Sequence, residues 1–193
     1  MKVVCSIKNV DTLNGHQAFL CTEYEVLLER AKFSEVTFII GKQELRLHKS
    51  ILSSRSPVFA AMFDNNFEES VSNKVVIEDQ SFEVMKEFFR YIYAAKINNI
   101  EDHAIELLGL SNKYVVVKLI NLCEEYLMSN IKKENALDYL NIASLYTAEN
   151  LISKCIAFII SNVKEIAKVP GFDINVLPRD VRNDLFKLLA EKS

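Results

Sequence analysis

Histidines, which often transfer protons or bind metal near neutral pH, are few and isolated in this sequence. Its three histidines, His16, His48 and His103, have no second ligand nearby at the spacing of a zinc site. His48 lies where a predicted strand meets a predicted helix, and a catalytic role there would need a nucleophile that the sequence does not place. We therefore predict a structural hydrogen bond for His48 at this junction.

Motifs of catalytic loops are absent from the sequence. It contains no nucleophile elbow, phosphate-binding glycine loop, metalloprotease helix or calcium loop, and only 4 glycines occur in 193 residues. The adjacent carboxylates Glu68-Glu69 and Glu124-Glu125 lie in polar stretches and are predicted to be solvated. We predict a protein that is not an enzyme and has no metal or cofactor.

Composition and charge narrow the range of partners. Half of the residues are hydrophobic, which is enough for a core, and the formal net charge of -3 argues against nucleic acid as a partner. The apolar runs are far shorter than the roughly 20 residues that span a bilayer. The scattered cysteines are predicted to be buried or half-buried free thiols, which favours a soluble protein of the nucleus or cytoplasm. They are Cys5, Cys21, Cys123 and Cys155.

The first 30 residues of the sequence predict a strand, a turn and a helix. Residues 2–10 alternate loosely and include β-branched residues, which is typical of a strand, and residues 11–15 (DTLNG) form a turn cluster. Leu20, Tyr24 and Leu27 then recur at spacings of four and three, which predicts an amphipathic helix of about three turns. The apolar face of this helix must bury against another surface.

The remaining pattern predicts a small sheet and many helices. Residues 36–40 and 43–47 indicate a hairpin, and residues 74–77 a third strand. Helices are expected at 50–54, from Pro57, at 82–93, 104–110, 115–128, 136–146 and 151–163, and after Leu177-Pro178. The fold class is therefore α+β and mostly helical. A short link at 129–134 predicts that the helical tail packs directly on the preceding part.

The order of motifs in the middle of the chain resembles the BTB/POZ domain. The matching segments are HKSILSSRSPVFAAMF (48–63), FEES (67–70), VVIED (75–79) and FRYIY (89–93). Two positions depart from the family pattern, because Glu35 replaces an aspartate and Ala94-Ala95 replaces Thr-Gly. The resemblance covers residues 33–128 and implies a BTB fold, a small sheet flanked by helices.

The flanking segments suggest a three-part organisation. The residues of these motifs most resemble the speckle-type POZ, or MATH–BTB, group of cullin-3 adaptors. In cullin-3 adaptors a helical BACK extension follows the BTB domain. We expect a BTB domain at 20–128 and a BACK-like extension at 129–193, with residues 136–163 as its first helical hairpin. Residues 1–19 are interpreted as a strand or linker, resembling the last strand of a MATH domain. The sequence is then either a fragment or a relative without that domain.

Two surfaces follow from this resemblance. The first is a homodimer face formed by Leu20, Tyr24 and Leu27 together with Ile51, although the same stripe could instead cover the sheet of its own domain. The second is a cullin-3 face, because Phe67-Glu68-Glu69 matches the hydrophobic-x-Glu motif of cullin adaptors. Phe67 would fill a pocket and Glu69 would fix the orientation, unless Phe67 packs onto its own domain.

The expected function is that of a non-catalytic dimeric adaptor. It would recruit cullin-3 into a ubiquitin ligase that acts on a substrate protein of unknown identity. The alternative is a BTB module that only self-associates, as in transcriptional regulation. In the tail, Phe186 is interpreted either as a second self-association contact, which would give open chains of dimers, or as a helix core residue.

Overall fold

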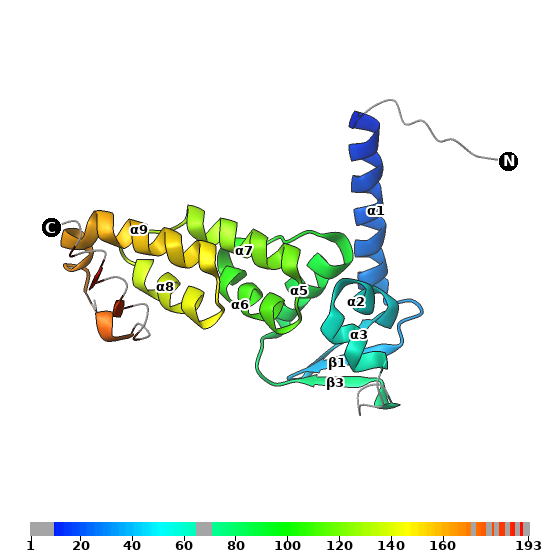
Figure 1. The fold of residues 1–193 in the computed structure, drawn as a ribbon. Coiled ribbons are helices and arrows are strands. Elements are labelled where there is room, and N and C mark those ends of the chain that lie inside the picture. The colour runs from blue at the N-terminus through cyan, green and yellow to red at the C-terminus, as the bar shows by residue number, and fades with distance from the viewer. Residues whose placement is uncertain are drawn as a thin grey trace. The chain divides into compact units, whose positions relative to one another are not determined.

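The computed structural model describes residues 10–64, 71–170 and 173–176, together with residues 179, 182, 183, 186, 187 and 190. The chain divides into two compact units, Met1–Asn99 and Ile100–Ser193. Most of their helices and strands are labelled in Figure 1. The predicted fold class, mostly helical with one small sheet, is confirmed.

The elements agree closely with those predicted from residue 36 onward. Those of the first unit are α1 (Val10–Arg30), β1 (Val36–Ile40), β2 (Gln43–Leu47), α2 (Lys49–Arg55), α3 (Pro57–Asp64), β3 (Lys74–Ile77) and α5 (Phe82–Ala94). Those of the second unit are α6 (Ile100–Lys113), α7 (Val117–Ser129), α8 (Ala136–Leu145), α9 (Glu149–Ile166) and a short 3-10 helix (Ile174–Val176).

The sheet of the first unit has the strand order β2-β1-β3. Strands β1 and β2 form the predicted antiparallel hairpin, with Val36 opposite Leu47. Gly41 turns the chain with a φ of +59°, a conformation that glycine adopts without steric cost. Strand β3 pairs in parallel with the other edge of β1, and the two strands are labelled side by side in Figure 1.

Aromatic residues from three elements form the core of this unit. Strand β1 buries alternate side chains, and Phe38 at its centre is fully buried. The Phe38 ring meets Phe59 of α3 and Phe89 of α5 edge-on, with ring centroids 5.8 Å and 4.8 Å apart. Helix α5 begins as predicted at Ser81, whose Oγ accepts a hydrogen bond from the Val84 N–H. Helices α3 and α5 are thus fixed against β1.

Helix α1 is longer than the sequence predicted. It runs continuously over Val10–Arg30, so the turn predicted at residues 11–15 is wrong, and Val10 is helical rather than the end of a strand. Gly15 and its polar neighbours have weak helix propensities, but no proline interrupts them, and each residue added to an existing helix gains a hydrogen bond. The rest of the predicted N-terminal strand, residues 2–9, lies outside the described residues.

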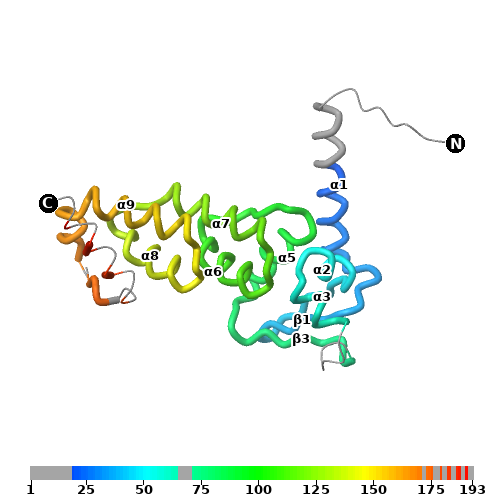
Figure 2. Tube along the Cα trace, viewed as in Figure 1, coloured from blue at the N-terminus to red at the C-terminus, as the bar shows by residue number. Residues whose placement is uncertain are grey.

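The second unit is built from helix pairs. Helix α6 packs on α7, α8 packs on α9, and α9 also packs on α7, which confirms that the helical tail packs directly on the preceding helices. Figure 2 traces this path along the chain. Gly109 of α6 allows a close approach, because a Cβ atom there would lie 2.6 Å from the Tyr146 hydroxyl.

One predicted exposed carboxylate is buried. Glu124 is only 7% exposed, whereas its neighbour Glu125 is exposed as expected. Helix α7 is covered by both α6 and α9, so its buried face is wider than that of a helix with one neighbour. Glu124 follows the fully buried Cys123 in the sequence, and both residues are buried.

Helix α6 ends with a strained residue. The Val116 N–H bonds to the Ser111 carbonyl and the Val115 N–H to the Asn112 carbonyl, which is the pattern of a Schellman motif. This motif places Val115 in the left-handed region with a φ of +55°. Glycine is usual at this position, and a β-branched residue there carries a steric cost of roughly 1–2 kcal/mol.

We predict that Val115→Gly raises the free energy of unfolding by about 1 kcal/mol, because glycine removes the steric cost at Val115. The check is urea unfolding followed by circular dichroism. Glu125→Gly is the matched control, because it introduces glycine at an exposed position inside α7 and should lower stability by about 1 kcal/mol. Equal destabilisation by both changes would contradict the assignment of strain.

Candidate interaction surface

One side of helix α1 is anchored to its own unit. Leu28 is buried, and helix α1 packs on α5. Glu25, on the same side, accepts a hydrogen bond from Lys96 Nζ at 2.7 Å and lies 3.9 Å from Arg90 Nε. Arg90 also pairs with the buried Glu87. These contacts fix the rotation of α1 about its axis.

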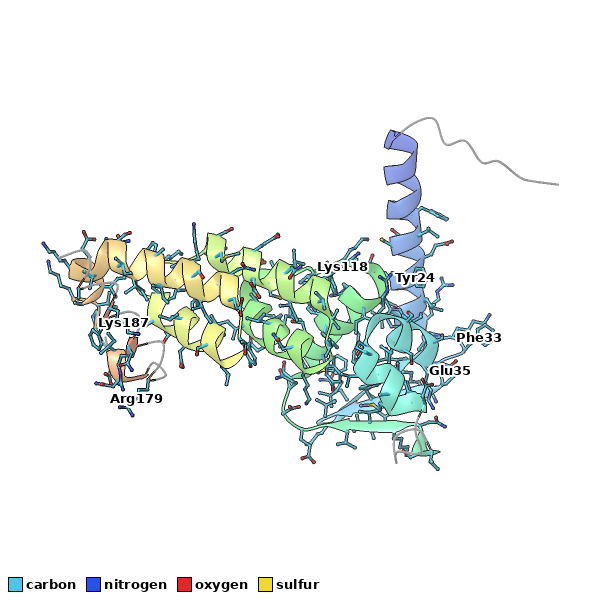
Figure 3. The ribbon with its side chains drawn as sticks, in the orientation of Figure 1. Tyr24, Phe33, Glu35, Lys118, Arg179 and Lys187 are labelled. Carbon is cyan, nitrogen blue, oxygen red and sulfur yellow. The ribbon has the colours of Figure 1, made fainter. Side chains whose placement is uncertain are left out.

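The predicted dimer stripe lies on a different side of α1. Leu20 is 52% exposed, Tyr24 is 43% exposed, and Leu27 is half-buried. Tyr24 is labelled in Figure 3. At 100° per residue, Leu20 and Leu27 lie about 140° and 160° around the helix from Glu25, whereas Tyr24 lies between Leu20 and the buried Leu28. Leu20 and Tyr24 therefore leave part of an apolar face of α1 open to solvent.

Two further apolar residues widen this face beyond the sequence prediction. Phe19 is 61% exposed and Val26 is 42% exposed. Their separation of seven residues puts them on one side of the helix, and this spacing was the signal that could have found them. We define the open face as Phe19, Leu20, Tyr24, Val26 and Leu27.

The other predicted dimer residue and an exposed aromatic lie on neighbouring elements. Ile51 is on α2 and is half-buried. Phe33 follows α1, is 80% exposed, and has a φ of +67°, which is unusual for a bulky residue. Figure 3 shows Phe33 extending away from the sheet and helices. The Lys32 ammonium lies 4.9 Å from the centre of its ring.

His48 has the structural role that the sequence predicts. Burial raises the pKa of Tyr93 to about 12, and the charge of Glu35 adds to this increase although the hydrogen bond from the His48 N–H opposes it. The Tyr93 hydroxyl therefore stays protonated, accepts from the His48 N–H at 2.8 Å and donates to Nδ1 at 2.9 Å. Nε2 then carries the proton and donates to the Lys32 carbonyl at 2.7 Å. The imidazole ties the loop after α1 to α5.

We predict that Tyr93→Phe lowers the free energy of unfolding by about 1–3 kcal/mol, because two buried groups of His48 lose their partner. Chemical denaturation measures this loss. Tyr126→Phe removes a hydroxyl from a half-buried tyrosine of α7, outside the predicted dimer stripe, and should change stability by less than about 0.5 kcal/mol. Similar stability of the two variants would show that the His48–Tyr93 bond contributes little.

The described cysteines have structural rather than reactive environments. Burial raises the pKa of Cys123 to about 12, with a further contribution from the charge of Glu124, and burial alone raises the pKa of Cys155 to about 12. Both thiols therefore stay protonated at neutral pH, and Cys21 is half-buried. Within the described residues, no group of three or more potential ligands could hold a metal ion.

Three predicted contact residues lie in the segment after α3 and in the C-terminal part of the chain. Phe67 and Glu69 lie outside the described residues, in the segment between α3 and β3. Phe186 is helical and 51% exposed. Among the described residues, no helix is long and apolar enough to cross a membrane.

Comparison with known proteins identifies the family. Residues 24–131, more than half of the chain, match the family model of the BTB/POZ domain. The chain belongs to the BTB/POZ family. A BTB domain is a protein-interaction module, and BTB domains commonly self-associate as dimers.

Solved BTB domains have the same fold. The BTB domain of zebrafish PATZ1 is 18% identical, with a TM-score of 0.52, and the BTB (Tramtrack and Bric a brac) domain of human gigaxonin is 22% identical, with a TM-score of 0.50. Each comparison covers 65% of this chain and 99% of the other chain. The BTB fold assigned from the motif order is confirmed, while the predicted domain limits of 20–128 and 129–193 stay predictions.

Proposed function

We propose that this chain is a dimeric, non-catalytic adaptor that recruits cullin-3 to a ubiquitin ligase. Membership of the BTB family supports an interaction role. The observation that carries the proposal of self-association is the open face of α1, which exposes apolar residues on a helix whose other side is fixed to α5. Burying such a face in a second copy removes apolar surface from water.

The proposal of cullin-3 binding starts from the sequence that follows α3. Helix α3 ends at Asp64, and Phe67-Glu68-Glu69 follows within three residues. An aromatic residue in a polar segment is suited to act as an anchor in a partner's pocket, with Glu69 setting the orientation through hydrogen bonds. The role of the chain would be to bring cullin-3 close to a substrate protein, with the chemistry of ubiquitin transfer carried out elsewhere.

The helical tail is proposed as a BACK-like extension. Helices α8 and α9 form a packed pair after the BTB match ends at residue 131, and α9 packs on α7. We further propose that Phe186 makes a second self-association contact, since half of its surface is exposed. Two separate isologous contacts would join dimers into open chains.

A binding experiment separates this proposal from simple self-association. The chain is immobilised and the purified N-terminal region of cullin-3 is passed over it, and saturable binding is expected. A chain that forms dimers but retains no cullin-3 would instead act as a self-association module without a ligase. That result would overturn the adaptor proposal.

A further inference from the structure

Strand β2 lies at an edge of the sheet. In the order β2-β1-β3, no further strand of the described residues pairs with it. The Thr37 N–H of β1 donates to the Asn73 carbonyl on the β3 side at 2.9 Å, so the residues next to Thr37 form the hydrogen bonds with β2. Along β2, Leu45 takes part in this pairing, and the main-chain N–H and C=O groups of Glu44 and Arg46 therefore point toward the open edge.

The side chains of β2 also suit an added strand. Those of Glu44 and Arg46 lie on one face of the sheet, and both residues are exposed. Leu45 points to the opposite face, toward α1 and α5, and is half-buried. An added strand therefore meets an acidic and a basic residue on one face and an apolar residue on the other.

A pocket lies on the α1 and α5 side of β2. It has a volume of about 120 Å³, and all of its lining residues belong to the first unit. An apolar cavity of roughly 150 Å³ in another protein holds benzene, so a mainly apolar pocket of this size accepts one aliphatic side chain. The lining residues are Leu28 and Glu29 of α1, Leu45 of β2, and Phe82, Lys86 and Phe89 of α5.

We propose that the β2 edge and this pocket together bind an extended peptide of a partner protein that has the order acidic, aliphatic, basic. Running antiparallel to β2, such a peptide exchanges main-chain hydrogen bonds with Glu44 and Arg46. Its acidic residue lies opposite Arg46 and its basic residue opposite Glu44, which are favourable cross-strand pairs. The aliphatic residue between them lies opposite Leu45 and enters the pocket.

A second copy of β2 fits this edge less well than a peptide does. Its own Glu44-Leu45-Arg46 has the same order of charges, but its Leu45 already lines the pocket of its own copy. Pairing about a two-fold axis would also bring α1 and α5 of the second copy to the face of the sheet on which the pocket lies. A peptide brings no helices with it. The inference is independent of the proposed dimer and of cullin-3, and in an adaptor the peptide would belong to the substrate protein.

Peptide binding to the full chain tests this site. Fluorescence anisotropy with a fluorescein-labelled peptide Thr-Thr-Glu-Leu-Lys-Thr-Thr should show saturable binding. Replacing the leucine of the peptide by alanine leaves the pocket largely empty and should weaken binding about 10-fold. Exchanging the glutamate and lysine of the peptide places like charges opposite each other and should also weaken binding about 10-fold.

Arg46→Glu is the matching change in the chain, because Arg46 is exposed on the edge strand. It should weaken binding of the Glu-Leu-Lys peptide about 10-fold and favour a peptide with lysine at both charged positions. Lys42→Glu is the control, because it makes the same change in charge at an exposed position of the hairpin turn, outside β2. It should leave the affinity for the peptide unchanged.

Equal binding of the three peptides would overturn the register and the use of the pocket, and no binding at about 1 mM peptide would overturn the site as a whole. If Arg46→Glu lowers the mass of the chain in sedimentation equilibrium without changing peptide binding, the edge pairs with a second copy and the peptide proposal fails.

Discussion

Leu27→Ala is expected to weaken the dimer by about 100-fold in Kd. Truncating a leucine at the centre of an interface costs more than about 1 kcal/mol, and a two-fold contact contains the change twice. A total loss of 2–3 kcal/mol corresponds to about 100-fold. Sedimentation equilibrium over a range of concentrations measures this shift.

Leu145→Ala is the control for this change. Leu145 is 72% exposed on α8, outside the open face, so the same truncation there should leave the dimer intact. Because Leu27 is half-buried, thermal unfolding of the variant must also show a folded chain. A folded Leu27→Ala chain that dimerises like Leu145→Ala would contradict the assignment of this face.

Combining Phe67→Ala with Glu69→Lys is expected to abolish the retention of cullin-3 while the dimer persists. Loss of an aromatic anchor costs at least about 2 kcal/mol at a hot spot, and reversing an interfacial charge adds to that loss, so a decrease of at least about 100-fold is expected. Isothermal titration with the N-terminal region of cullin-3 measures the affinity.

The adjacent glutamate provides a close control for this second prediction. Glu68→Lys makes the same charge change at the variable position of the hydrophobic-x-Glu pattern, so affinity should stay within a few-fold of the wild type. If the double variant still binds as tightly as Glu68→Lys, Phe67 and Glu69 do not form the cullin contact. A double variant that loses its dimer would show damage to the fold instead.

Most helices and strands could be predicted from the sequence, because residues at their own ends mark where they begin or turn. Gly41 marks the hairpin, Ser81 caps α5, and Pro57 starts α3 at the predicted position. The turn expected at residues 11–15 was wrong, since a turn cluster of polar residues and one glycine does not stop a helix that is already formed. The burial of Glu124 was not predicted, because the sequence pattern does not show that α7 packs against two helices, α6 and α9.

The candidate surface could be predicted only in part. The spacing of Leu20, Tyr24 and Leu27 predicts an apolar stripe, but it does not say which side of the helix meets its own domain. The side of α1 that meets its own domain is fixed in part by the hydrogen bond between Lys96 and Glu25. These two residues are 71 positions apart in the sequence. In the same way, the position of His48 between a strand and a helix predicts a hydrogen bond. It does not predict the partner, because Tyr93 lies 45 residues away in the sequence.

The chain is proposed to self-associate and to bind cullin-3 in the same complex. Size-exclusion chromatography with light scattering, applied to the wild-type chain mixed with the N-terminal region of cullin-3, tests it directly. Alone, the chain should elute with at least about twice its 22.1 kDa mass, and more where the Phe186 contact joins dimers; the mixture should give complexes that contain equal numbers of the two proteins. A cullin-3 region that elutes apart from the chain, or a chain that elutes at 22.1 kDa, would contradict the account.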